Sequence, residues 1–200
     1  DSIGANRVDW RYDPIIIDQD HPISYHLDKF GKYCEALHRY TTRCIFSFLD
    51  SYSHLHGRFS PPKPTQMQEV AAGFSKIAAS YSLPLFTCCE AVDLSSLGIQ
   101  HGACIDPIKI QELLGFPIRA KKDTGQREHC GCIQSVDIGV YDTCTAGCTY
   151  CYATHRMEYA LRNAQAHDPS SPLLIGWPED TQEITDRSMV SLAVPQLRLF

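Results

Sequence analysis

Short apolar runs alternate with segments of helical periodicity along most of the chain, and this alternation limits the folds open to it. Residues Arg43–Leu49 form a nearly continuous apolar run, which is typical of a strand buried on both faces of a sheet. Further strands are expected within Arg7–Ile17, over Pro84–Cys89 and over Ser135–Tyr141. Strands that alternate with helices pair in parallel, because each helix returns the chain to the starting edge of the sheet.

The segments between these strands carry the helical signal. Helices are expected within Pro22–Tyr40, over Met67–Tyr81, near Asp106–Leu114 and over Tyr152–Ala166. The second of these has the clearest apolar stripe, with a period of about 3.6 residues. Residues Gly115–Ile133 lack periodicity, which predicts an ordered, functional loop.

Four strand–helix units are half of an eight-unit barrel. The sequence therefore predicts an α/β chain, either an open sheet or, as we favour, a partial or permuted (β/α) barrel with TIM-barrel-like parallel strands and flanking helices. Residues 1–134 would hold three units and the ordered loop, residues 135–166 a cysteine-bearing unit, and residues 167–200 a C-terminal strap. The edges of half a barrel need a cover, so we expect a missing N-terminal half as a partner.

Composition narrows the class of protein. The chain is 44% hydrophobic and 20% charged, which excludes intrinsic disorder, and its net charge of −5 does not indicate nucleic acid as a partner. No apolar run reaches the ~18 residues of a membrane span. Ten cysteines without a secretory signal predict a cytoplasmic, reducing compartment, where clustered cysteines hold metal more often than each other.

Three of these cysteines, Cys144, Cys148 and Cys151, follow the predicted strand Ser135–Tyr141 in C-x3-C-x2-C spacing. On a short loop their thiolates can face one centre, and three protein ligands on a four-iron cluster leave one iron open. A zinc site completed by His155 is the main alternative, and three cysteines without a common ligand is another. Asp142 precedes the loop, and we expect it to order the loop through backbone N–H groups.

A second group of cysteines is expected at the carboxyl ends of the strands, where barrel active sites assemble. Cys88 lies at the end of the third predicted strand, Pro84–Cys89, and Cys104 lies in the loop that follows. Cys130 and Cys132 form a C-x-C pair. These four could converge on a second, fully ligated cluster or on a zinc ion. The alternative is a few buried free thiols together with one reactive pair.

Polar residues at the same strand ends are candidates for contact with a substrate. Arg11, Asp13 and Glu90 are candidate catalytic residues, and Gln126 and Arg127 could hold a carboxylate or phosphate. The alternative is that Arg11 and Asp13 pair with each other and that Gln126 and Arg127 anchor their loop.

The motif C-x3-C-x-aromatic-C, with Tyr150 before the last cysteine, resembles the cluster loop of radical S-adenosylmethionine (radical SAM) enzymes. This resemblance implies a [4Fe-4S] cluster whose open iron binds S-adenosylmethionine, with Tyr150 and Tyr152 as candidates to stack on the adenosyl group. In those enzymes the loop lies near the start of the barrel. Here it follows three other units, which is why a permuted barrel is expected.

A wider resemblance covers nearly the whole chain. The sequence is similar to the C-terminal two-thirds of the DUF1848 family, which has no settled reaction and whose C-terminal cysteines resemble the radical SAM cluster. The motifs that carry it are WRYDP at Trp10–Pro14, TCCE at Thr87–Glu90, HGACID at His101–Asp106, QREHCGC at Gln126–Cys132, DIGVYDTC at Asp137–Cys144, CTYCYA at Cys148–Ala153 and HDPSSPLL at His167–Leu174.

Taken together, the residues and the resemblance predict an iron–sulfur protein with one or two [4Fe-4S] clusters. A radical SAM-like enzyme, with an unidentified substrate and a reductant such as ferredoxin or flavodoxin, is the favoured interpretation. A non-catalytic iron–sulfur electron-transfer or sensor protein, or a structural zinc protein, is the alternative.

Overall fold

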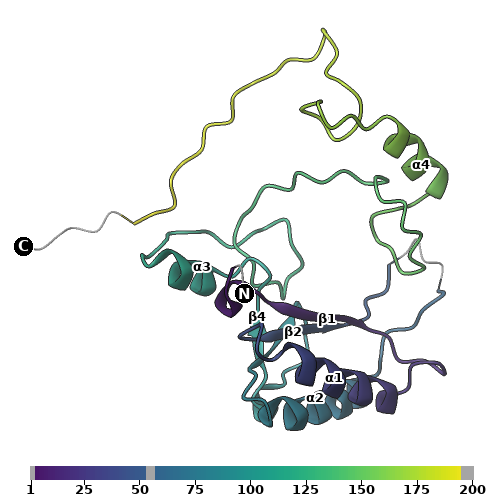
Figure 1. The fold of residues 1–200 in the computed structure, drawn as a ribbon, viewed down its shortest axis with the longest axis vertical. Helices are drawn as coiled ribbons and strands as arrows, with labels where there is room; N and C mark the ends of the chain where they lie inside the picture. Colours follow the sequence, from purple (N-terminus) through teal and green to yellow (C-terminus); the bar gives the residue numbers. More distant parts are fainter. Residues whose placement is uncertain (1–2, 53–56, 195–200) are drawn as a thin grey trace, which may run out of the picture. The chain divides into compact units, whose positions relative to one another are not determined.

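The chain divides into two compact units in the computed structural model, which describes residues 3–52 and 57–194. The sheet unit comprises the described parts of residues 1–51, 59–135 and 192–200 (Figure 1). The cysteine-loop unit comprises the described parts of residues 52–58 and 136–191. The two units are described separately below.

The sheet unit is built on four parallel strands in the order β1-β2-β3-β4. The strands are β1 (Trp10–Ile15), β2 (Cys44–Phe48), β3 (Leu85–Cys88) and β4 (Gln100–Gly102). The first three lie where the sequence predicts them. An α/β fold with an all-parallel sheet is thus confirmed.

Two helices connect the first three strands and pack against one another, as Figure 1 shows. They are α1 (Ile23–Leu37) and α2 (Pro64–Ala79), and both predicted helices are confirmed. The rings of Phe30 from α1 and Phe74 from α2 stack with their centroids 3.8 Å apart, and Phe46 of β2 meets Phe74 edge-on at 5.6 Å. All three rings are fully buried, so the core lies between these helices and the sheet.

The remaining helices are short. Two 3-10 turns, Ala5–Arg7 and Ser95–Leu97, precede β1 and β4, and α3 (Pro107–Leu114) follows β4. The last helix, α4 (Met157–Gln165), belongs to the cysteine-loop unit. None of the helices in the described part of the chain is both long and apolar enough to cross a membrane.

Residues 135–141, where the sequence predicts a fourth strand, form no strand, and that prediction is wrong. The alternation of Val136, Ile138 and Val140 suggests one buried face, yet all three are exposed, Ile138 at 85%. A strand needs a neighbour to pair with its backbone groups, and among the described residues nothing pairs with this segment. The fourth strand of the sheet is instead β4, whose three residues are too few to show a period.

The other differences also lie beyond residue 135. Helix α4 begins at Met157, five residues later than predicted from Tyr152, because the Asp142 carboxylate already binds the backbone N–H groups of His155 and Arg156. The side chains of residues 179–193 are exposed, and the predicted strap is seen only in part: the described end of the tail pairs with residues 117–119, where the amide of Arg119 donates to the Leu192 carbonyl at 2.8 Å and Ala193 bridges Ile118. The apolar end of that strap, residues 195–200, lies outside the described residues.

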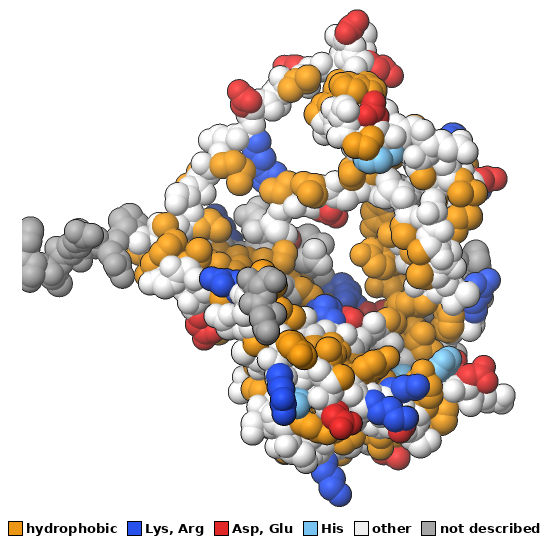
Figure 2. Space-filling view, viewed as in Figure 1, with side chains coloured by type: hydrophobic (Ala, Val, Ile, Leu, Met, Phe, Trp, Pro, Cys, Tyr) orange, Lys and Arg blue, Asp and Glu red, His pale blue; other side chains and the backbone are white. Residues whose placement is uncertain are grey.

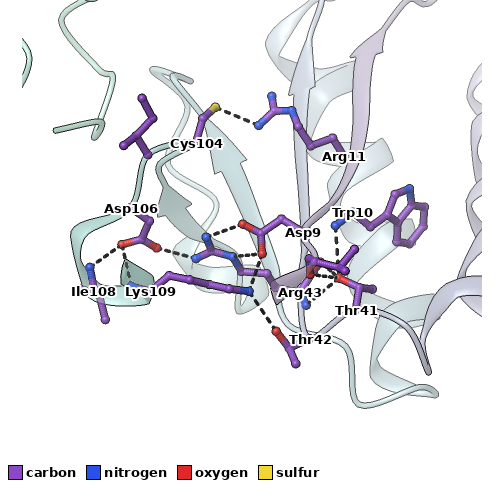
Figure 3. Close-up of polar contacts among 12 residues, drawn as sticks. Asp9, Trp10, Arg11, Thr41, Thr42, Arg43, Cys104, Asp106, Ile108 and Lys109 are labelled. Carbon is purple, nitrogen blue, oxygen red and sulfur yellow. Dashed lines mark hydrogen bonds and ion pairs between the residues drawn. The ribbon is translucent and has the colours of Figure 1, made fainter. Parts of the chain in front are cut away.

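A network of charged groups joins α3 to the residues that directly precede β1 and β2 (Figure 3). The buried guanidinium of Arg43 donates to both carboxylate oxygens of Asp9, at 2.9 and 2.7 Å, and to Asp106 at 2.5 Å. Lys109 of α3 donates to Asp9 at 2.6 Å, while Asp106 caps that helix through the amide of Ile108 at 2.9 Å. Burial alone would raise the pKa of Asp9, but hydrogen bonds and charges from Arg43 and Lys109 outweigh it and lower that pKa.

The substitution Asp9→Asn is expected to reduce the free energy of unfolding by about 2 kcal/mol at pH 7, because it leaves Arg43 without its bidentate partner. Urea denaturation measures this loss. Asp28→Asn is the matched control. Asp28 forms an exposed pair with Lys32, so this substitution should cost no more than about 0.5 kcal/mol.

The stabilisation by Asp9 is present above the ordinary carboxyl pKa and is lost as pH falls through the lowered pKa of Asp9 in the folded protein. A constant difference from pH 7 down to pH 2 would contradict this account.

Candidate metal-binding cysteine sites

Several of the predicted residues meet near the carboxyl ends of the parallel strands, which Arg11 reaches with its long side chain from the second position of β1. Arg11 and Asp13 of β1 form an ion pair, as one interpretation of the sequence predicted, and Ser47 of β2 donates to Asp13 at 3.4 Å. The guanidinium of Arg11 also donates to the Sγ atom of Cys104 at 2.9 Å (Figure 3). Arg11 therefore links its carboxylate partner to a thiol that follows β4.

Cys88 and Cys104 are in direct contact, with their Sγ atoms 3.2 Å apart. The hydrogen bond with Cys104, together with the Arg11 guanidinium, lowers the pKa of Cys88 to about 6 against the effect of burial. The same hydrogen bond and burial raise the pKa of Cys104. The opposite shifts of the two pKa values follow from the short contact between the two sulfur atoms and from the guanidinium beside them.

The C-x-C pair lies against the end of β4. Cys130 and Cys132 are buried in a small cluster with Ala103, and the amide of Ile105 donates to the Cys132 Sγ atom at 3.4 Å. Gly131 between them leaves little room for a side chain, since a Cβ atom there would lie 3.2 Å from the carbonyl oxygen of Gly102. Cys89, next in sequence to Cys88, packs on the same cluster. The loop of residues 115–133, which lacks periodicity in the sequence, is thus well packed at its two cysteines.

Charged side chains surround this edge. Glu90 is half-buried and accepts the backbone N–H of Phe48 at 2.7 Å. Burial raises the pKa of Glu90 to about 7, so its carboxyl group can hold or release a proton near neutrality. Arg127 forms an ion pair with Asp50, while Gln126 is exposed on the loop. This ion pair agrees with the interpretation that Arg127 anchors its loop.

In the cysteine-loop unit, Cys144 and Cys148 are exposed and Cys151 is half-buried. The Cys151 Sγ atom accepts the amide of Thr154 at 3.2 Å. Burial alone would raise the pKa of this thiol, but backbone N–H groups of Ala153 and Thr154 lower it overall. Gly147 adopts φ +69°, a left-handed conformation that turns the chain between the first two cysteines.

Asp142 closes the base of this loop, as the sequence predicted. Its carboxylate accepts the backbone N–H groups of His155 at 2.6 Å and Arg156 at 3.2 Å, and its own amide donates to the carbonyl of Ala153 at 2.8 Å. The side chain of Asn163 in α4 donates to the Asp142 carbonyl at 2.9 Å. Both ends of the cysteine loop are therefore tied to α4.

Tyr150 and Tyr152 pack on a third tyrosine that the sequence analysis did not single out. The Tyr52 ring centroid lies 5.8 Å from that of Tyr150 and 6.1 Å from that of Tyr152. Apolar side chains of this unit remain exposed, among them Tyr152 and Leu161, and Figure 2 shows such side chains around α4. Tyr52 is distant from the loop in sequence, so no local sequence pattern could predict this contact.

None of the ten cysteines forms a disulfide, and all ten lie among the described residues. In the described part of the chain, no three His, Cys, Asp or Glu side chains are arranged to hold a metal ion as they stand. The donor chemistry of both cysteine groups suits a thiophilic metal, but ligation would require thiol side chains to rotate.

Comparison with known proteins gives one match. The family model described as a domain of unknown function, DUF1848, matches residues 1–153, a span that contains all seven candidate ligand cysteines. No curated protein and no solved structure matches the chain.

The substitution Asp142→Gly should loosen the cysteine loop while keeping the left-handed backbone at this position, where φ is +57°. We expect the amides of His155 and Arg156 to exchange with solvent at least about tenfold faster, because each loses a charged acceptor. Hydrogen–deuterium exchange measures this change. Asp137→Gly is the control, since Asp137 accepts the amide of Gly139 and should leave those two amides unaffected. Equal exchange in both variants would show that Asp142 does not hold the loop.

Proposed function

The chain belongs to the DUF1848 family, and from that premise we propose that it is an iron–sulfur enzyme of radical SAM type. Cys144, Cys148 and Cys151 would hold a [4Fe-4S] cluster. The observation that carries the proposal is the loop itself, in which three cysteines outside any disulfide follow Asp142, whose carboxylate accepts the His155 amide, and the last of the three sulfur atoms accepts a backbone N–H. The parallel sheet would be part of a partial or permuted (β/α) barrel.

The residues of the loop have distinct tasks in this proposal. A cluster held by these three thiolates would have an open iron, and it would supply the chemistry for reductive cleavage of bound S-adenosylmethionine. The amides of Ala153 and Thr154 stabilise the thiolate form of Cys151, the form that ligates iron. Asp142 holds both ends of the loop, so that the three thiols stay on one short segment.

Tyr150 and Tyr152 are the proposed contacts for the adenosyl group. Both rings already pack on Tyr52, which restricts their orientation before any ligand binds. Flat aromatic faces stack on a purine ring. A reductant such as ferredoxin or flavodoxin would deliver the electron.

Zinc is the second candidate, and one observation favours it. His155 lies beside the cysteine loop with its Nδ1 atom 3.5 Å from the Asp142 carboxylate. A histidine that ligates zinc is usually oriented in this way, by a carboxylate on one ring nitrogen. Three thiolates and His155 would then form a structural site without redox chemistry.

Anaerobic reconstitution with iron and sulfide tests the proposed function. We expect the reduced protein to show an EPR signal that shifts when S-adenosylmethionine is added, because the cosubstrate binds the open iron. The variant in which Cys144, Cys148 and Cys151 are all replaced by Ser should lose this shift. Cys89→Ser, which changes a cysteine outside both proposed ligand sets, should keep it.

Other outcomes would contradict the proposal in different ways. Iron at Cys144, Cys148 and Cys151 without any shift would identify an electron carrier or sensor. Zinc at these cysteines in the protein as purified, lost on His155→Ala, would identify the structural site. A shift that persists in the triple variant would place the reactive cluster elsewhere.

A further inference from the structure

We propose that Cys88, Cys104, Cys130 and Cys132 form a second, closed metal centre with four thiolate ligands at the carboxyl edge of the sheet. This site lies entirely within the sheet unit and uses none of the residues of the cysteine loop. It goes beyond the proposed function, and it stands or fails independently of it.

The sheet itself supplies the first two ligands. Cys88 is the last residue of β3, and its register partner on β4 is Gly102, two residues before Cys104. Parallel pairing therefore brings both thiols to the same edge, and their Sγ atoms lie 3.2 Å apart. In a tetrahedral site with metal–sulfur bonds of ~2.3 Å, thiolates lie about 3.8 Å apart. A small opening of this pair would admit an ion between the two sulfur atoms.

The loop supplies the other two ligands from the adjacent cluster. Cys130 and Cys132 are buried with Ala103, the residue that precedes Cys104, and Cys89, the residue that follows Cys88, packs on them. Gly131 allows the loop to approach the carbonyl of Gly102 closely. The C-x-C pair is thus seated beside the first pair by backbone packing, so that rotations of the side chains, without a change of fold, would complete the ligand set.

The surroundings offset the charge that such a centre would carry. Four thiolates around a divalent ion leave a net charge of −2, which needs nearby donors when it is buried. Arg11 donates to Cys104 at 2.9 Å, and the Ile105 amide donates to Cys132 at 3.4 Å. Cys104 is exposed while the other three cysteines are buried, so the ion has an entry path on that side.

The ligand set also indicates the role of the centre. Four protein thiolates leave no open coordination position, which suits a structural zinc ion or an electron-transfer cluster and does not suit substrate binding. The centre would join β3, β4 and the loop that follows α3. It would add to the pairing of β3 with β4 and to the hydrogen bond from the Ile133 amide to the Ile105 carbonyl at 3.1 Å.

The test uses the full chain with Cys144, Cys148 and Cys151 replaced by Ser, so that the proposed radical SAM loop cannot contribute. The reduced, metal-free protein is titrated anaerobically with Co²⁺, and in parallel the metal content of the protein as purified is measured. We expect one Co²⁺ per chain, with the thiolate-to-cobalt charge-transfer and ligand-field bands of a tetrahedral thiolate site. Zinc or iron in the purified protein then identifies the native metal.

Single variants in this background identify the ligands. Cys104→Ser and Cys132→Ser should each weaken Co²⁺ binding at least about tenfold, whereas Cys89→Ser should leave it unchanged. Cys104 is exposed, so its replacement is the substitution least prone to disturb folding. Unchanged binding in Cys104→Ser would overturn the proposal.

A second measurement covers the case in which variants unfold. Alkylation of the unsubstituted native protein, followed by peptide mapping, should show that bound metal protects Cys88, Cys104, Cys130 and Cys132 together and that a chelator removes this protection. Protection that does not change with metal, or a disulfide between Cys88 and Cys104 in the freshly purified protein, would identify a reactive thiol pair and overturn the metal centre.

Discussion

Parallel pairing of the four strands is the constraint on which the sheet unit depends. Because every strand runs in the same direction, all four carboxyl ends lie at one edge, and residues distant in sequence meet there. Cys88 is the last residue of β3, Cys104 follows β4 by two residues, and Arg11 reaches them from the second position of β1; two hydrogen bonds join the three side chains. The stacked aromatic rings of α1 and α2 hold the sheet in place from one face, while Arg43 fixes α3. The candidate chemistry of this unit is a consequence of its topology.

The cysteine-loop unit is organised differently, by a few local hydrogen bonds in place of a sheet. Asp142 joins the start of the loop to the residues before α4, and Thr154 donates to the sulfur atom of Cys151. Little apolar surface is buried here, and Ala160 is the buried hydrophobic residue of α4. A bound cluster would therefore add cohesion to a unit that has a small core of its own. Metal binding and local folding are expected to be coupled in this part of the chain.

Much of the sheet unit could be predicted from the sequence, whereas the region after residue 135 could not. Long amphipathic patterns located α1 and α2, and the continuous apolar run located β2, because burial on a fixed face leaves a period in the sequence. Residues 135–141 show such a period without a partner strand, and β4 is too short to show one. The convergence of Cys88 and Cys104 followed from the order of the strands. The contact of Arg11 with Cys104 and the packing of Tyr150 and Tyr152 on Tyr52 depend on tertiary structure, which leaves no local pattern in the sequence.

The central claim is that the chain carries two separate thiolate centres, one in each unit. Native mass spectrometry of the anaerobically reconstituted protein tests it directly, since the intact mass counts the inorganic atoms bound to one chain. The account predicts one [4Fe-4S] cluster plus one further zinc ion or cluster. Replacement of Cys144, Cys148 and Cys151 by Ser should remove the first group alone, and Cys104→Ser should remove the second alone. A metal-free mass, or one group lost in both variants, would contradict it.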